Sequence, residues 1–515
     1  MLVPLGFLFV AAFTGDSAAV RDTVLRPRTF AVIGRTLGLA AAVLAATTVL
    51  ALPAAFLVVR TNLRFRKLLS VLLVLPLAVP GYLLAFALLS VGGRYGAAAR
   101  LTGFELPRLQ GFTGSVIALT LYNFPYLFLT FRAALRRLDP TLHEAARALG
   151  HGPWRAFGAA ELPQLRPAFL AGGLIVVLHV LGDFGVVSLM RYETFSVLLY
   201  GSLSFAPAYA AWIALMMLGT AGGFIVLELV LLRGRRYDPA APGAGRLPRP
   251  VALGLAGPPA LLAVLVFLAV AVGLPLTTSL YWVFQPALGF VNQGLTEPAL
   301  ASLSVSLPTA LLATVLAVPI ARLTVQRRRA GASVSQGLER LAYAGYATPG
   351  LAFGLALTAM ALTLDRLFVA PGQTLLYQSL PLMVYAYVLH FLAEAIGPVR
   401  TAFQQINPRL EEAARTLGRG RVAAFCTVTL PLLRPGLGAA AALVFLSAMK
   451  ELPLAVLLRP AGYDTLAFNL WDLTAEGLYA EAAPFALVIL ALGVAFVALV
   501  MLSEKTDDRP SGPNA

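Results

Sequence analysis

Long apolar runs follow one another along almost the whole chain, and they limit the possible folds more than any other feature. About 20 apolar residues suffice for a helix to cross a bilayer, where only helices and closed barrels satisfy their own backbone hydrogen bonds. Only 12% of the 515 residues are charged, whereas soluble domains carry about 25%. We therefore expect an all-α integral membrane protein. The expected spans are about 31–59, 68–91, 112–131, 168–190, 207–232, 251–275, 299–321, 341–363, 375–398, 436–458 and 482–503.

A shorter apolar run, residues 2–13, precedes these spans. It falls short of the length of a full span, and no basic residues precede it, as they would in a cleaved signal peptide. We interpret it as a first span that is cut short, which gives about twelve spans, six in each half. The basic, proline- and glycine-rich residues 233–250 have the composition of a linker. We expect a first half at 1–232 and a second half at 251–515.

The positive charges indicate the orientation of the chain in the membrane. With the N-terminus in the cytoplasm, 28 of the 39 Lys and Arg residues lie in segments that face the cytoplasm, as the positive-inside rule requires. The net charge of +15 thus reflects topology, and we expect membrane lipid but no nucleic acid as a partner. The segments are 60–67, 132–166, 233–250, 322–340, 400–434 and 504–515.

One polar stretch occurs twice. Residues 138–167 (the first repeated loop) and 406–435 (the second repeated loop) align without a gap at an offset of 268, and 16 of the 30 positions are identical. Six expected spans separate the loops, an even number, so both loops should lie on the cytoplasmic side. The two halves are then parallel repeats, unlike the inverted repeats of many secondary transporters.

Each repeated loop carries the same helix signals. An N-cap residue and a proline begin a short helix, and a glycine about ten residues later ends it in the left-handed conformation. A second helix follows, and we expect a Leu-Pro pair to break it. The signals are Asp139, Pro140, Gly150 and Pro163 in the first loop, and Asn407, Pro408, Gly418 and Pro431 in the second.

The most specific part of the repeat is a Glu-Ala-Ala triplet, a glycine four residues after it and a later Leu-Pro pair. It resembles the EAA loop of the membrane subunits of binding-protein-dependent ABC importers. The residues are Glu144, Ala145, Ala146, Gly150 and Pro163, and then Glu412, Ala413, Ala414, Gly418 and Pro431.

This resemblance implies a fused double permease with the type I ABC importer permease fold, in the inner (plasma) membrane of a bacterial cell. It also implies that the first helix of each loop docks into a groove of an ATP-hydrolysing subunit. The implied partners are two copies of that ATPase and a periplasmic or lipid-anchored substrate-binding protein. Glu144 or Glu412 would pair with a basic residue of the ATPase.

The sequence contains no phosphate-binding loop of its own. Such a loop ends in Gly-Lys-Ser/Thr, and none of Lys67, Lys450 and Lys505 follows a glycine. No His-Glu-x-x-His pattern occurs among the four histidines either. We therefore expect a non-enzymatic chain that binds no cofactor, with ATP and magnesium held by the partner ATPase. The single cysteine, Cys426, excludes an intramolecular disulfide.

Two features inside the spans occur in both halves and mark a possible translocation pathway. Pro80-Gly81 recurs as Pro349-Gly350, either as packing kinks or as hinges lining the pathway. Asp183 recurs as Glu451, and acids within the membrane are costly and usually functional. Lys450 beside Glu451 also allows a purely structural ion pair.

Two further acids lie in the expected spans. Glu394 follows His390 by one helical turn, and we expect it near the cytoplasmic end, where a long side chain reaches water at little cost. The same interpretation applies to Glu228.

The stretches that begin at Gly182 and Lys450 are similar to ferric-iron importer permeases, and thiamine importer permeases are the nearest alternative. A hard trivalent cation prefers oxygen ligands, which Asp183, Glu451, Tyr192 and Tyr200 would supply. The sequence therefore favours ferric iron as cargo and assigns no resident metal site. A gradient-driven secondary transporter and a channel or scaffold are rival functions, although neither would need a duplicated docking loop.

Overall fold

The computed structural model describes residues 2–13, 17–138, 140–232, 250–285, 294–325, 337, 342–370, 373–407 and 409–507. These residues form helices and connecting loops, and the part of the chain so described contains one isolated parallel β-bridge, between Thr61 and Val251. The expected all-α membrane fold is confirmed.

Nine helices among the described residues are long and apolar enough to cross a membrane. A bent pair of helices, Arg66–Ala78 and Gly81–Val91, provides a tenth candidate span, and two shorter apolar helices, Leu2–Phe13 (α1) and one within Tyr479–Asp507 (α26), occupy the remaining expected places. The count of twelve spans stays a prediction. The nine helices are Pro27–Arg60 (α3), Gly111–Arg137 (α7), Phe157–Gly182 (α10 from Arg166), Pro207–Leu232 (α13), Gly254–Val283 (α14, Gly257–Leu268, and α15, Leu274–Val283), Thr296–Val325 (α16), Gly350–Phe368 (α19), Leu380–Gln405 (α20) and Arg421–Met449 (α23 from Leu430).

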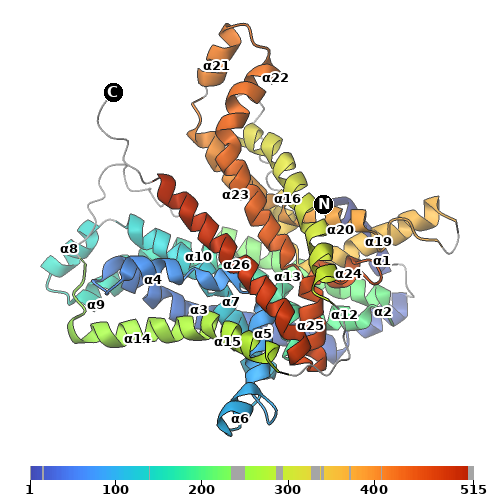
Figure 1. Ribbon diagram of the computed structural model, residues 1–515, viewed down its shortest axis with the longest axis horizontal. Helices are drawn as coiled ribbons and strands as arrows, with labels where there is room; N and C mark the ends of the chain where they lie inside the picture. Colours follow the sequence, from blue (N-terminus) through green and yellow to red (C-terminus); the bar gives the residue numbers. More distant parts are fainter. Residues whose placement is uncertain are drawn as a thin grey trace.

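Each half has its own helix bundle. Helices α3, α7 and α10 pack together in the first half, and α16, α20 and α23 pack together in the second. The two bundles run in different directions and diverge toward the ends that carry the repeated loops (Figure 1). Six of the nine candidate spans lie between the two loops, an even number, and the placement of both loops on the same side stays a prediction.

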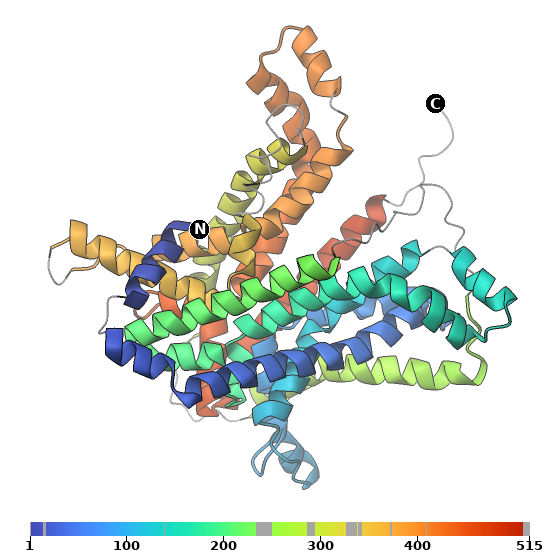
Figure 2. The same cartoon turned by 180° about the vertical axis from the view of Figure 1, so that it is seen from behind.

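The first span of each half packs against the other half. Helix α1 contacts α19, and α15 contacts Gly81–Val91 (α5). Helices α5 and α19 occupy equivalent places after the two Pro-Gly pairs, so this exchange follows the internal repeat. Figure 2 shows the first half from behind, with α3 along the full length of its bundle. The exchange ties the two halves together.

Three spans that the apolar runs predict as continuous are broken in the structure. Residues 66–91 bend by 88° at Pro80, because a residue before proline is disfavoured in the helical conformation. Helix α10 ends at Gly182 and is followed by Gly185–Leu189 (α11) and Phe195–Ser202 (α12). Helix α23 ends at Met449 and is followed by Pro453–Leu458 (α24) and Leu466–Glu476 (α25). An apolar run does not reveal these breaks, since both pieces of each span are apolar.

Candidate functional site

The first helix of each repeated loop ends as predicted. Helix α8 (Pro140–Ala148) is followed by Gly150 with φ +84°, and α21 (Arg409–Thr416) is followed by Gly418 with φ +85°. A left-handed glycine lets the next amide turn back to a carbonyl five residues earlier. His151 N–H accordingly donates to Ala146 O, and Arg419 N–H donates to Ala414 O, both at 3.2 Å.

The predicted helix starts are described in part. Pro140 is the first residue of α8, and Asn407 Oδ1 accepts a hydrogen bond from Arg409 N–H at 3.0 Å. Asp139 and Pro408 lie outside the described residues.

The expected break at the Leu-Pro pairs is wrong. The chain passes from Phe157–Glu161 through Pro163 into α10, and from Phe425–Thr429 through Pro431 into α23, each as one candidate span. Both five-residue segments are π turns, in which the hydrogen bond reaches one residue farther back. We infer that this shift accommodates a proline, which lacks an N–H and would clash with the carbonyl four residues before it.

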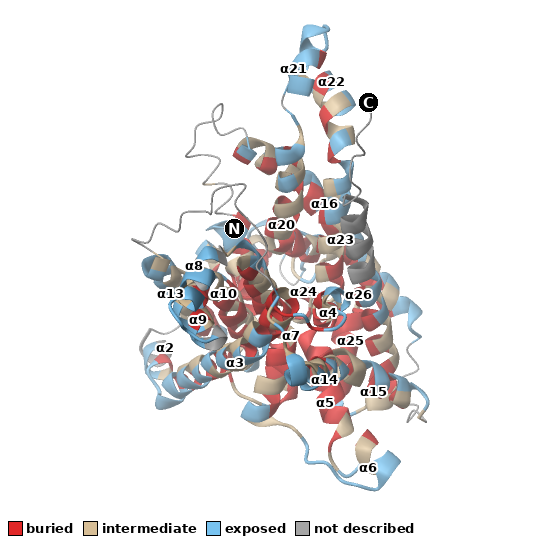
Figure 3. Cartoon of the chain, turned by 90° about the vertical axis from the view of Figure 1, so that its left-hand side faces the viewer, coloured by how far each residue is buried: buried red, intermediate tan, exposed pale blue. Residues whose placement is uncertain are grey.

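The Glu-Ala-Ala positions present the same face in both loops. Glu144, Ala145 and Gly150 are exposed and Ala146 is half-buried, while Glu412, Ala413 and Gly418 are exposed and Ala414 is buried. Helix α21 projects from the end of its bundle, and α8 lies at the end of the other bundle (Figure 3). Both loops are therefore accessible to a second protein.

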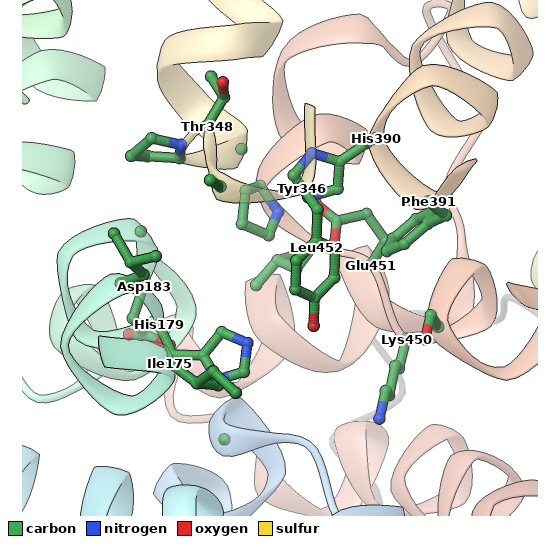
Figure 4. Close-up of a pocket in the computed structure, with 18 of the residues that line it drawn as sticks. Ile175, His179, Asp183, Tyr346, Thr348, His390, Phe391, Lys450, Glu451 and Leu452 are labelled. Carbon is green, nitrogen blue, oxygen red and sulfur yellow. The ribbon is translucent and has the colours of Figure 1, made fainter. Parts of the chain in front are cut away.

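A cavity of about 380 Å³ lies between the two halves. Its walls come from α7 and α10 on one side and from α20, α23 and the segment before α19 on the other (Figure 4). Both Pro-Gly pairs and both paired acids line it. The predicted pathway residues in its wall are Pro80, Gly81, Asp183, Pro349, Gly350 and Glu451.

The paired acids cap the short helices that follow the broken spans. Asp183 Oδ1 accepts from Val186 N–H at 3.0 Å at the start of α11, and Glu451 Oε1 accepts from Leu454 N–H at 3.0 Å at the start of α24. The loss of a long helix is thus partly offset, because each carboxylate satisfies an amide at a helix start. These contacts explain why an acid recurs at this point of each half.

The glycines of the two Pro-Gly pairs allow close packing against these caps. A Cβ on Gly81 would lie 2.8 Å from Val186 Cγ2 and 3.7 Å from Asp183 Oδ2. A Cβ on Gly350 would lie 3.0 Å from Pro453 Cβ and 3.4 Å from Glu451 Oε1. Each Pro-Gly pair therefore packs directly on the acid of its own half.

Hydrogen bonds join the two halves beside the cavity. Tyr82 Oη donates to Lys450 O, and Lys450 Nζ donates to Leu77 O, both at 3.2 Å. Beyond them, Trp471 Nε1 donates to Ser188 Oγ at 2.9 Å. Lys450 thus bonds the opposite half and lines the cavity wall.

A histidine in the cavity wall is surrounded by tyrosines that the sequence analysis did not single out. The ring of His179 lies 4.5 Å from that of Tyr126, 6.0 Å from Tyr122 and 6.4 Å from Tyr346. Its Nδ1 lies 3.2 Å from Asn123 Oδ1. The offset of 268 carries Tyr122 onto His390 and Tyr126 onto Glu394, so the internal repeat held a signal that could have found them.

The expected position of Glu394 near the cytoplasmic end is corrected by the structure. Glu394 and His390 line the central cavity, together with Ser447 and Lys450. The sequence interpretation relied on distance along the span, and it did not account for the divergence of the bundles, which places this part of α20 in the cavity wall. Glu228 is half-buried in α13 and does not line the cavity.

The four proposed oxygen ligands of iron do not come together. Tyr200 packs against Phe184 and Trp471, with ring centroids 4.9 and 6.4 Å away, and Tyr192 Oη donates to Arg35 O. Neither tyrosine lines the cavity. The described residues also contain no group of three or more His, Cys, Asp or Glu side chains placed to hold a metal ion.

Comparison with known families matches this architecture. The family described as "Binding-protein-dependent transport system inner membrane component" matches residues 47–288 and again 313–506. The chain belongs to this family. It is a fused double permease of a binding-protein-dependent ABC importer, a multi-pass protein of the inner membrane.

Individual relatives differ in how much of the chain they match. The Fe(3+)-transport system permease protein FbpB 2 of Haemophilus influenzae is 29% identical over 94% of this chain and 92% of its own length. The molybdenum transport system permease protein ModB of Azotobacter vinelandii is 28% identical over 39% of this chain and 90% of its own length. The sulfate transport system permease protein CysT of Escherichia coli is 31% identical over 36% of this chain and 68% of its own length.

Proposed function

We propose that this permease carries ferric iron across the inner membrane, and that two copies of an ATPase subunit drive it through the repeated loops. The observation that carries the cargo proposal is the extent of the match. The ferric-iron relative is similar along both halves, 94% of the chain, whereas the molybdenum and sulfate relatives match less than half of it.

The chemistry of the cavity supports a cationic cargo. Three carboxyl side chains, those of Asp183, Glu394 and Glu451, line the cavity, with Lys450 as the single lysine among the lining residues. Carboxylate and phenol oxygens are the donors that hard cations prefer. A site for a free oxyanion would instead present converging arginines or backbone amides.

The caps limit how the cavity would contact iron. One oxygen of Asp183 and one of Glu451 are already engaged by backbone amides, and no described group of three His, Cys, Asp or Glu ligands is in place. We therefore propose that iron crosses with ligands of its own, and that the cavity contacts the complex rather than replacing its coordination shell. Direct ligation needs more convergent oxygen donors.

The repeated loops support the proposed partners. They are exposed, they share one geometry, and an even number of candidate spans separates them. Two like surfaces suit two copies of one ATPase. In this proposal, closure of the ATPase pair on ATP draws the loops together and opens the cavity toward the outer side.

The cargo is tested by reconstitution. The permease, its ATPase and the binding protein encoded beside it are placed in liposomes, and uptake of radioactive ferric citrate is measured with ATP enclosed. Uptake supports the proposal if it needs ATP and persists in the presence of an excess of about tenfold of molybdate, sulfate or thiamine. Uptake of molybdate, sulfate or thiamine in place of iron contradicts it.

The energy source is tested in the same preparation. Uptake should persist when an uncoupler collapses the ion gradients and should stop when ATP is omitted. The opposite pattern would identify a gradient-driven carrier.

A further inference from the structure

The end of α3 is joined to the first repeated loop by a buried ion pair. Arg60 Nη2 lies 3.0 Å from Glu161 Oε2, and both side chains are only 4% exposed. Glu161 is the last residue of the π turn Phe157–Glu161. One helical turn before Arg60, Phe56 packs edge-on against Phe157 with ring centroids 4.9 Å apart. The last two turns of α3 therefore hold both ends of the π turn.

The end of α16 is joined to the second repeated loop in a related way. Arg322 Nη2 lies 2.6 Å from Glu411 Oε1 in the first turn of α21. The other oxygen of Glu411 accepts from Thr429 Oγ1 at 3.0 Å, and the Arg322 guanidinium lies 4.8 Å from the ring centroid of Phe425. Phe425 and Thr429 are the two ends of the π turn Phe425–Thr429. Arg322 and Glu411 thus hold α21 and the π turn together.

The two ion pairs occupy positions that the internal repeat does not carry over. The offset of 268 places Glu161 opposite Thr429 and Glu411 opposite His143. The same offset places Arg322 opposite Ala54 rather than opposite Arg60. Each half therefore joins the same two elements with a base and an acid of its own, while the aromatic residue that begins the π turn is shared. A contact that merely filled space would not need to be rebuilt from different residues.

The π turn explains why such a joint matters. A π turn interrupts the regular hydrogen bonds of a helix, and helices bend at such places. Without a brace, a force applied to α8 or α21 would bend the chain at the π turn and would not move the bundle. A side-chain link to the first core helix bypasses that weak point.

We propose that Arg60–Glu161 and Arg322–Glu411 are positioning pairs that brace the π turns, so that each repeated loop moves as one body with its bundle. This inference rests on the proposed docking of the ATPase on the loops. The pairs themselves contact neither cargo nor nucleotide in this proposal. They determine how much of a loop displacement reaches the cavity.

The test uses Glu161→Gln and Glu411→Gln in the complete complex of permease, ATPase and binding protein in liposomes. Three quantities are measured: ATPase retained by the permease, the basal ATPase rate, and cargo transported per ATP hydrolysed. For Glu161→Gln, which lies outside the docking helices, we expect retention and basal rate to stay unchanged while transport per ATP falls by about fivefold or more, the lower end of typical coupling between sites. For Glu411→Gln, which lies in α21, only transport per ATP of the retained ATPase is compared. A smaller fall is expected for Glu411→Gln, because its pair is half-exposed, with side chains 30% and 19% exposed.

A charge swap and a matched control distinguish positioning from general damage. The double variant Arg322→Glu/Glu411→Arg should regain most of the transport per ATP that Glu411→Gln loses. The control is Glu193→Gln, which removes the partner of Arg28 and Arg35 at the opposite end of α3, at 2.6 and 2.8 Å. It should leave transport per ATP unchanged.

The proposal is overturned if folded, ATPase-bound Glu161→Gln and Glu411→Gln both transport as much per ATP as the wild type. It is also overturned if the charge swap stays as impaired as the single variant. Should Glu161→Gln fail to fold, the Glu411 variants decide the question. Failure of the wild-type chain to retain any ATPase would contradict the proposed function and not the bracing.

Discussion

The two repeated loops share one backbone geometry but are held in place by different side chains. Their glycines have φ values of +84° and +85°, and a five-residue π turn follows the first four helical residues of each second helix. The first loop is held by a buried ion pair and an aromatic pair. The second is held by a half-exposed arginine that contacts Glu411 and Phe425, and by a hydrogen bond from Thr429 to the same Glu411. The comparison teaches that the surface offered to a partner is preserved, whereas its support inside each half is free to change.

The cavity walls show the same contrast. The capping acids and the Pro-Gly pairs occur in both walls, but the first half adds Tyr122, Tyr126 and His179 where the second adds His390, Glu394 and Ser447. The breaks in the spans therefore occur in both halves, whereas the polar side chains that line the cavity differ between the halves.

The largest effect is expected when both loop surfaces are blocked. In Gly150→Trp/Gly418→Trp, a bulky side chain lies on the exposed turn of each loop, and a non-glycine residue at these positive φ values adds about 1–3 kcal/mol of strain per site. We expect loss of ATPase retention and of transport. If both survive, the loops are not the ATPase contacts.

The two single variants sharpen the comparison of the loops. Because Gly150 and Gly418 have the same geometry, Gly150→Trp and Gly418→Trp should weaken ATPase retention by similar factors. A strong effect from one and none from the other would show that the partner does not treat the loops as equivalent.

Replacement of each arginine should lower the stability of the protein by an amount that depends on how deeply its ion pair is buried. Arg60→Met leaves Glu161 buried without its partner, which costs about 3–5 kcal/mol of stability. Arg322→Met removes a half-exposed pair, which costs about 1 kcal/mol or less. Thermal unfolding of the purified permease in detergent measures both. Equal losses would contradict the difference in burial.

The Pro-Gly pairs should differ in how they tolerate a methyl group. The Cβ of Gly81→Ala would lie 2.8 Å from Val186 Cγ2, and that of Gly350→Ala 3.0 Å from Pro453 Cβ. Overpacking of this kind costs about 1–3 kcal/mol, so both variants should unfold at lower temperature, Gly81→Ala the more so. Gly222→Ala in α13, where a Cβ meets nothing within 4 Å, is the control and should show no loss.

The smallest effects are expected from single polar groups of the cavity wall. Glu394→Gln should lower iron uptake about tenfold, and Tyr126→Phe at the equivalent place of the first half about threefold, since hydrogen bonds to charged groups are worth more than neutral ones. Initial uptake rates over a range of ferric citrate concentrations measure both. Unchanged rates in Glu394→Gln, with normal ATPase activity, would remove this residue from the pathway.

Much of the architecture was predictable because it depends on local or repeated features. Apolar length determines where helices cross, and the glycines after Ala148 and Thr416 end their helices by a backbone preference that needs no distant partner. The parallel repeat follows from an even number of spans between two aligned loops. The Leu-Pro pairs were misjudged, because a π turn leaves no mark in composition.

The candidate site was predictable only where it follows the repeat. Asp183 and Glu451 were found because equivalent positions carry the same chemistry, whereas Tyr122 and Tyr126 are equivalent to residues of a different type, His390 and Glu394. Tyr192 and Tyr200 have suitable chemistry, but the breaks after α10 turn their segment away from the cavity. Proximity in sequence to a capping acid does not imply proximity in space.

By itself, the sequence determined that this chain is a membrane protein of two parallel halves, each with the same kind of exposed loop. Lipid allows few backbone conformations, and two similar sequences adopt similar local structures. Only the tertiary structure decided which side chains meet between the halves and which hold each loop. Those contacts join residues such as Arg60 and Glu161, or Lys450 and Leu77, that are far apart in the chain. Their pairing depends on the angles at which whole helices bend and diverge, which no local pattern encodes.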